Sequence, residues 1–305
     1  MSVKEFRFDG RVAVVTGAGS NPGLGRSYAM LLAARGAKVV VNDLGVGPDG
    51  RGQIGPGAEA VVAEIRAVGG EAVSDGHSVA ERDGARAIIG AALDAWGRVD
   101  ILINNAGIAP FARFDEISDQ DIERVVGVHL MGHIWMCRAA WPHMTERGYG
   151  RLVNISSGAA LVGLPFQSIY AAAKLGIVGL TRSLAAEGAE HGIKANAIAP
   201  YADTVALQTM LKPHVSERNR ASGMVPEAVA PVAAWLAHED CTVSGKLLDT
   251  SAGSMSEAFL SRTAATGPDP GLTIETVSAA VGRALDRSTG APYPNAGEFI
   301  YDEVR

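Results

Sequence analysis

Short apolar segments alternate with helical patterns along most of the chain. Several of these segments are apolar without alternation, as expected for strands that are covered on both faces. Helical patterns such as RSYAMLLAARG separate them. This order predicts an α/β fold, a doubly wound parallel sheet with right-handed crossovers. The expected strands are VAVVTG (12–17), AKVVVND (37–43), EAVSD (71–75), VDILINNAG (99–107), GRLVNISS (150–157), IKANAIAP (193–200) and GKLLDT (245–250).

Three segments depart from this rhythm. Residues 44–57 are rich in Gly and Pro and predict an exposed loop. Residues 202–225 follow a strand at its carboxyl end, where a segment that covers a ligand is expected. The tail, 254–305, carries an apolar stripe at helical spacing: Ile274, Val277, Val281 and Leu285. We predict a single α/β domain over 1–253, and a helical C-terminal extension over 254–305 that packs on it.

Composition narrows the possible functions. The chain has 305 residues, of which 47% are hydrophobic and 20% charged, so it can bury a large core. The net charge is −6 and the 27 basic residues are dispersed, which argues against nucleic-acid binding. Cys137 and Cys241 stand far apart, so no metal site and no disulfide framework are expected. The N-terminus lacks a signal-peptide core, and no window approaches about 18 uninterrupted apolar residues. We therefore expect a cytoplasmic protein without a membrane partner.

The segment VAVVTGAGSNPGLGRSYAMLLAARG has the order strand, glycine loop, helix. Glycines let the backbone approach a pyrophosphate, and the free N–H groups and dipole of the helix favour its charge. Asp43 ends the next strand and completes the pattern of a dinucleotide site. Its carboxylate can bind the ribose hydroxyls and would repel a 2′-phosphate, so NAD is predicted; an Asp that caps a turn is the alternative. The loop residues expected to contact the cofactor are Gly17, Gly19, Asn21, Gly23, Leu24 and Gly25.

Tyr170 and Lys174 lie one helical turn apart in the apolar run SIYAAAKLG. Removing the proton of an alcohol needs a base near neutral pH, whereas free tyrosine has a pKa of about 10. A nearby ammonium group in apolar surroundings, together with the positive nicotinamide of NAD⁺, favours the phenolate. The two residues could also be a half-buried aromatic and a solvated charge.

In combination these motifs resemble the short-chain dehydrogenase/reductase family. They are Thr16-Gly17, Gly23-Leu24-Gly25, Asn104-Asn105-Ala106-Gly107, and Ser157 thirteen residues before Tyr170. The resemblance implies a Rossmann-type fold and hydride transfer between a nicotinamide and a secondary alcohol or ketone. It implies that Tyr170 is the general acid/base and that Ser157 holds the substrate oxygen. Lys174 is implied to hydrogen-bond to the nicotinamide ribose.

The resemblance assigns further positions. His129 replaces the family's usual Asn, whose main-chain carbonyl holds a water of the proton relay, and Asn104 supports the sheet. The remaining implied cofactor contacts are Ser78, Val79, Asn105, Ala106, Gly107, Pro200 and Thr204.

Longer strings such as VVVNDLG and YAAAKLGIVGL are similar to the (3R)-hydroxyacyl-CoA dehydrogenase units of peroxisomal multifunctional enzymes and to their bacterial relatives. A 3-hydroxyacyl-CoA or a hydroxysteroid is the substrate this implies. A reductase of terpenoid or xenobiotic ketones, and a dinucleotide sensor without catalysis, remain open. The family usually assembles through the helices expected over 113–140 and 168–189, so a homo-oligomer, dimer or tetramer, is expected.

The chain also departs from the family pattern. Five residues separate Gly17 from Gly23 where three are usual, so either the loop is longer or Gly19 takes the first glycine's place. His77 stands where relatives commonly have the Asp that holds adenine, and Tyr201 replaces a glycine. Tyr201 could narrow the nicotinamide pocket or reach the substrate.

Overall fold

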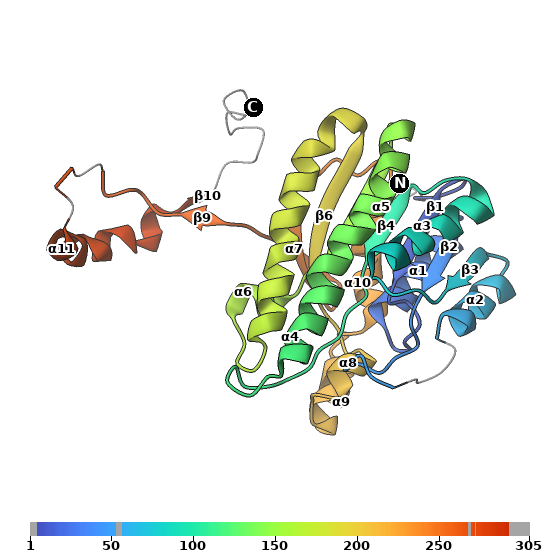
Figure 1. Ribbon diagram of the computed structural model, residues 1–305, viewed down its shortest axis with the longest axis horizontal. Helices are drawn as coiled ribbons and strands as arrows, with labels where there is room; N and C mark the ends of the chain where they lie inside the picture. The colour runs from blue at the N-terminus through green and yellow to red at the C-terminus, as the bar shows by residue number, and fades with distance from the viewer. Residues whose placement is uncertain (1–4, 53–56, 268–269, 272, 293–305) are drawn as a thin grey trace. The chain divides into compact units, whose positions relative to one another are not determined.

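The computed structural model describes residues 5–52, 57–267, 270–271 and 273–292 (Figure 1). Two compact units divide the chain, residues 1–256 and 257–305. The first unit is an eight-stranded sheet with helices on both faces, which confirms the predicted doubly wound fold.

The sheet has the strand order β3-β2-β1-β4-β5-β6-β7-β8, and the pairs from β3 through β7 are parallel. The order reverses between β1 and β4. In such sheets, ligands bind at the carboxyl ends of the strands beside this reversal. The strands are β1 (Val12–Thr16), β2 (Lys38–Asn42), β3 (Glu71–Asp75), β4 (Ile101–Asn104), β5 (Gly150–Ile155), β6 (Ile193–Tyr201), β7 (Leu247–Ser251) and β8 (Ser254–Ala258).

Helices α1, α2 and α10 supply buried side chains to one face of the sheet, and α3, α5 and α7 to the other (Figure 1). Alternate residues of β1 serve the two cores: Ala13 and Val15 the first, Val12 and Val14 the second. Burial on both faces explains why this strand shows no polar alternation. The helices of this unit are α1 (Leu24–Ala34), α2 (Gly57–Ala67), α3 (Arg82–Trp96), α4 (Asp119–Val126), a π-helical turn (Gly127–Met131), α5 (Gly132–Arg147), α6 (Gly158–Val162), α7 (Ser168–Glu187), a 3-10 turn (Ala189–His191), α8 (Val205–Gln208), α9 (Pro213–Ala221) and α10 (Pro226–Ala237).

Helix α7 has 20 residues and a mean hydropathy of 1.2 over its most apolar window, enough by length and composition to cross a membrane. A helix that packs in a protein core meets the same criterion. This helix lies against β6 and carries buried Lys174, so its composition is weak support for a membrane span.

The second unit contains α11 (Ile274–Ala284), a 3-10 turn (Arg287–Thr289) and the antiparallel pair β9 (Ser261–Arg262) and β10 (Ala291–Pro292). Helix α11 begins with a capping box between Thr273 and Thr276. Its predicted apolar stripe forms, and each of the four residues is at least 46% exposed. The docking of this stripe on the α/β domain stays a prediction.

Candidate active site

The structure places Ser157 directly after β5, as the N-cap of α6, where its hydroxyl oxygen accepts a hydrogen bond from the Ala159 amide at 3.2 Å. Tyr170 and Lys174 lie in the first turns of α7. A hydrogen bond from Ser157 acts on the Tyr170 phenol. The three residues predicted to be catalytic therefore meet at the carboxyl edge of the sheet.

Lys174 is a buried residue, only 3% exposed, so its charge is not solvated. Its Nζ donates to the Ile155 carbonyl at 2.6 Å and lies 5.6 Å from the centre of the Tyr170 ring. Burial lowers the pKa of Lys174 to about 7. Near neutral pH this side chain therefore exchanges a proton readily.

The pKa of Tyr170 in this chain reflects its burial. Burial raises it above its ordinary value, and the hydrogen bond from Ser157 opposes that rise without cancelling it. The expected lowering draws on the Lys174 ammonium group together with the positive nicotinamide of NAD⁺, and stays a prediction for the cofactor complex. In this structure Tyr170 is a phenol at neutral pH and can donate a proton.

His129 lies in the π-helical turn, with its ring edge-to-face with Tyr170 at 5.0 Å between centroids. Its Nε2 lies 2.6 Å from the Ile108 carbonyl oxygen and 3.1 Å from the Ile108 amide nitrogen. Burial, and secondarily the charge of Lys174, lower the pKa of His129 well below its ordinary value. A neutral imidazole therefore braces both the catalytic phenol and the loop after Gly107.

His133, one turn further on, is a buried residue that the sequence reasoning missed, although the spacing His-x-x-x-His was visible. The carbonyls of His129 and Asn104 hydrogen-bond to its ring, and burial lowers its pKa to about 3. Its Nε2 and the Nδ1 of His129 have no hydrogen-bond partner among the described residues. Buried unpaired nitrogens of this kind commonly mark positions of bound water.

Asn104 is buried at the end of β4 and contacts neighbouring elements. Its Nδ2 donates to Asn154 Oδ1 at 2.9 Å and to Cys137 Sγ at 3.2 Å. These contacts tie β4 to β5 and α5 beneath the site.

The glycine loop is held in place by the end of β4. The Asn105 side chain donates to the carbonyls of Thr16 and Gly17, each at 2.9 Å. The Thr16 hydroxyl accepts from the amides of Asn105 and Ala106 at 3.0 and 3.1 Å. Thr16 was quoted only as part of the motif, and the structure gives it this bracing function.

Gly17 provides the tight turn that ends β1. Its φ is +64°, and an added Cβ would lie 2.6 Å from the Cα of Ala106. Gly19 does not have a positive φ. We infer that Gly17 is the family's first glycine and that the loop is two residues longer than usual.

The carboxylate of Asp43 accepts from the Gly19 amide and from the Gly45 amide, each at 2.7 Å. It therefore caps the turn after β2 and also joins that turn to the glycine loop. Each oxygen has a second lone pair that can accept a ribose hydroxyl. Helix α1 starts at Leu24 after Gly23 without a side-chain cap, which leaves its first amides available to phosphate. These features fit a dinucleotide.

Four more predicted contacts lie at the carboxyl ends of β3 and β6. Ser78 Oγ accepts from the Ala80 amide. Val79 packs closely against Gly132, since a Cβ added to Gly132 would lie 3.1 Å from Val79 Cγ2. Pro200 is in β6, and Thr204 caps α8 by accepting from the Leu207 amide at 3.3 Å. Asn21 is exposed in the glycine loop.

His77 has a partner that the sequence did not reveal. Its Nδ1 lies 2.9 Å from Oδ2 of Asp75, a buried carboxylate that also accepts from Asn42 Nδ2 at 2.8 Å. Asp75 holds one nitrogen of the His77 ring, and the side chain, 60% exposed, is open to solvent.

Residues 202–225 form α8 and α9, and buried Asp203 holds this segment together. Its carboxylate accepts from Ser216, Gln208 and Arg220 at 2.7, 2.9 and 2.7 Å. Burial acts to raise the pKa of Asp203, but these hydrogen bonds outweigh it and lower the pKa. The Val205 amide donates to the Pro22 carbonyl at 3.0 Å, so this segment contacts the glycine loop. Tyr201 Oη accepts from Asn219 of α9 at 3.2 Å.

A glycine loop, an acidic residue after β2, and a Ser, Tyr and Lys at one sheet edge together define a dinucleotide-dependent oxidoreductase. Residues 11–215 match the pattern of the short chain dehydrogenase family. The chain belongs to the short-chain dehydrogenase family.

Named relatives agree with this assignment. The chain is 44% identical over 258 residues to the peroxisomal multifunctional enzyme type 2 of Mus musculus, which covers 85% of this chain and 34% of the mouse protein. It therefore spans about a third of that relative. It is 47% identical over 250 residues to a putative short-chain type dehydrogenase/reductase of Mycobacterium tuberculosis, covering 82% of this chain and 85% of that one.

A solved structure of 7α-hydroxysteroid dehydrogenase with NADH and 7-oxo glycochenodeoxycholic acid is also similar. It is 30% identical, has a TM-score of 0.72, and covers 81% of this chain and 95% of that one. The chain is thus an oxidoreductase that acts on CH–OH groups, and a nicotinamide dinucleotide is the cofactor of its family.

Proposed function

We propose that this chain is an NAD-dependent dehydrogenase of a secondary alcohol, with a 3-hydroxyacyl-CoA as its substrate. The observation that carries the proposal is the meeting of Ser157, Tyr170 and Lys174 at the carboxyl edge of the sheet. A dinucleotide sensor without catalysis would not need the Ser157 hydroxyl bonded to the buried Tyr170 phenol, nor a buried amine, Lys174, next to that phenol.

Asp43 supports NAD over NADP. A 2′-phosphate on the ribose would meet a carboxylate that the amides of Gly19 and Gly45 keep in position. The similarity to a dehydrogenase solved with NADH is consistent with this choice.

The chemistry divides between the cofactor and the chain. When bound, the nicotinamide accepts the hydride of the alcohol or gives it to the ketone. Ser157 donates a hydrogen bond to the substrate oxygen and so fixes its distance from Tyr170. Tyr170 takes the hydroxyl proton during oxidation and returns it during reduction. Lys174, with a pKa of about 7 and its Nζ near the Tyr170 ring, can take up and release a proton next to that phenol.

Apolar side chains in the segments that flank Ser157 and Tyr170 support an apolar substrate. Leu164 and Phe166 lie between the two residues in the chain and are 47% and 55% exposed. The Phe166 carbonyl accepts from the Ala112 amide at 3.3 Å, which joins this segment to the one that carries exposed Phe111. A fatty acyl chain or a steroid can cover such side chains.

The segment of α8 and α9 supports the CoA thioester over the steroid. Arg220 is bonded to Asp203, whereas Lys212 and Arg218 of the same segment are exposed. Two exposed cations in a segment that contacts the glycine loop can receive an acidic headgroup. A hydroxysteroid is the alternative, consistent with the similar bile-acid dehydrogenase.

A homo-oligomer and a cytosolic location are part of this proposal. Helix α7 lies in the segment expected at the interface and exposes Leu175. Cys137 and Cys241 are buried free thiols, which suits a reducing compartment. A strictly monomeric scattering profile would contradict the homo-oligomer. Recovery of the tagged protein in a membrane or organelle fraction would contradict the cytosolic location.

The test of substrate and cofactor is a matrix of initial rates. NAD⁺ and NADP⁺ are each supplied with a (3R)-3-hydroxyacyl-CoA, a 7α-hydroxysteroid and a simple secondary alcohol, and reduced cofactor is followed by its absorbance. We expect the highest kcat/KM with NAD⁺ and the CoA thioester. Preference for NADP⁺ would contradict the reading of Asp43, preference for the steroid would contradict the substrate, and NAD⁺ binding without turnover on any substrate would favour the sensor.

A further inference from the structure

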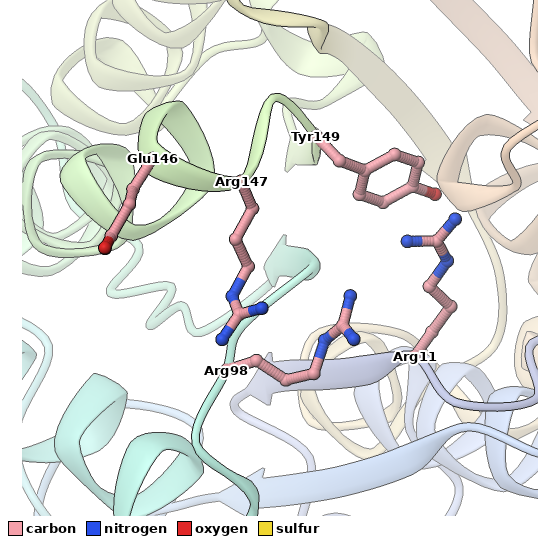
Figure 2. Close-up of a pocket in the computed structure, with 5 residues that line it drawn as sticks. All are labelled: Arg11, Arg98, Glu146, Arg147 and Tyr149. Atoms are coloured by element: carbon pink, nitrogen blue, oxygen red, sulfur yellow. The ribbon is translucent and has the colours of Figure 1, made fainter.

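A cavity of about 360 Å³ lies at the amino ends of β1, β4 and β5, the sheet edge opposite the catalytic residues. Figure 2 shows the five residues that line it, Arg11, Arg98, Glu146, Arg147 and Tyr149. Each basic residue precedes one of these three neighbouring strands in the chain, so the parallel register of the sheet brings their guanidinium groups together. The Glu146 side chain points away from them (Figure 2).

Only part of this positive charge is neutralised. The fully buried Asp100 carboxylate accepts from Arg98 at 2.6 and 2.8 Å and lies 3.5 Å from Arg11. Arg11 also pairs with Glu239 at 2.7 Å. Two of the three cavity arginines therefore have acidic partners.

Arg147 is the exception. Its Nη2 donates to the Gly97 carbonyl at 2.7 Å, and within the described part of the chain no carboxylate lies in ion-pair range of it. Arg151, next to Tyr149, is 5% exposed, and its hydrogen-bond acceptors among the described residues are carbonyls: those of Gly150, Gly192, His238 and Glu239. Arg147 is thus the cavity arginine whose guanidinium group has no acidic partner among the described residues.

Tyr149 adds a second, independent sign of a ligand. Its ring lies 3.8 Å from the guanidinium carbon of Arg11 and 4.4 Å from that of Arg151. Its hydroxyl is buried and has no hydrogen-bond partner in the described residues. An unpaired buried hydroxyl in the lining of the cavity is a donor that an external acceptor can satisfy.

We propose that this cavity is a second ligand site, which binds a small anion through a phosphoryl group. Guanidinium groups present pairs of N–H donors whose spacing matches phosphoryl oxygens, and the Tyr149 hydroxyl supplies one more donor. The volume exceeds what one phosphoryl group needs, so the anion can carry an organic remainder. The site lies across the sheet from the glycine loop, and a ligand here leaves the cofactor in place.

Isothermal titration calorimetry tests the proposal on the intact protein. Saturating NAD⁺ is present throughout, so that the glycine loop cannot bind the probes. The probes are inorganic phosphate, glycerol 3-phosphate and, as a carboxylate comparison, succinate. Arg147→Gln removes the cation without an acidic partner, and Tyr149→Phe removes the unpaired hydroxyl. Arg86→Gln is the matched control, because it removes an exposed arginine of α3 outside the cavity.

We expect saturable one-to-one binding of both phosphates, weakened about tenfold by Arg147→Gln, since a charged hydrogen bond is lost. Tyr149→Phe should weaken binding by a smaller factor and Arg86→Gln should leave it unchanged. The tighter of the two phosphates tells whether the organic remainder makes contacts of its own. Absence of saturable binding, equal weakening by Arg147→Gln and Arg86→Gln, or tighter binding of succinate would overturn the proposal.

Discussion

At the scale of single residues, burial decides the protonation of the catalytic pair. The spacing of Tyr170 and Lys174 was readable from the sequence, and the structure places them together. Their pKa values were not readable, because they depend on how deeply α7 lies against β5 and β6. Burial raises the pKa of Tyr170 and lowers that of Lys174, so the resting pair is a phenol beside an amine that is partly neutral near pH 7.

This resting state predicts opposite pH dependences for the two directions of the reaction. Oxidation needs the Tyr170 phenol to lose its proton, so kcat/KM for the alcohol should rise from about pH 7 through the alkaline range. Reduction uses the protonated phenol and should not rise over the same range. Rate profiles in both directions check this, and oxidation that declines as pH rises above neutrality would contradict it.

At the scale of elements, the segment of α8 and α9 depends on one buried carboxylate. Residues 202–225 were predicted only as a covering segment, because their two short helices have no strong apolar period. Asp203 holds three side chains of this segment, and its contact with Arg220 spans 17 residues of the chain. No local sequence pattern indicates these pairings. The edge strand β8 escaped prediction for a related reason, since its sequence SMSEA is largely exposed and polar.

Asp203→Asn should loosen this segment while the shape of the side chain is kept. The bond to Arg220 loses its charge, a change worth about 1.5–3 kcal/mol for a charged hydrogen bond. Because the segment contacts the glycine loop, we expect KM to rise several-fold for both cofactor and alcohol, with a smaller effect on kcat. Steady-state kinetics check this against Asp94→Asn, an exposed carboxylate on α3. Equal KM values in the two variants would contradict the role of Asp203.

At the scale of the whole molecule, the α/β fold followed from the sequence because strands covered on both faces lose their polar alternation. The positions of Ser157, the glycine loop and Asp43 followed from motif spacing. The second hydrogen-bonding role of Asp43, and the burial of His133 beneath the site, depend on how β1, β2 and α5 meet in space. The docking of α11 stays a prediction.

The two buried histidines predict how the free energy of unfolding depends on pH. Both are neutral when folded, and the unfolded chain binds their protons below about pH 6.5. Stability is therefore undiminished above that pH and is lost as pH falls toward the folded pKa, about 3 for His133. Each histidine contributes a slope of up to about 1.4 kcal/mol per pH unit.

His133→Ser should reduce the pH slope of the free energy of unfolding by the contribution of one histidine, up to about 1.4 kcal/mol per pH unit. Urea unfolding at a series of pH values between about 7 and 5 measures the slope for the wild type and the variant, and His143→Ser on the same helix is the control. An identical slope in the wild type and His133→Ser would show that His133 is not held neutral in the folded state.

The most direct test of the central claim compares two tyrosine variants in the same assay. Tyr170→Phe removes the catalytic phenol, whereas Tyr28→Phe removes a buried hydroxyl in α1 that has no hydrogen-bond partner among the described residues. We predict that turnover with NAD⁺ falls by roughly 10²- to 10⁴-fold in Tyr170→Phe, with NAD⁺ affinity and the unfolding transition retained, and stays near wild type in Tyr28→Phe. Turnover by Tyr170→Phe close to that of the wild type would contradict the assignment of Ser157, Tyr170 and Lys174 as the catalytic centre.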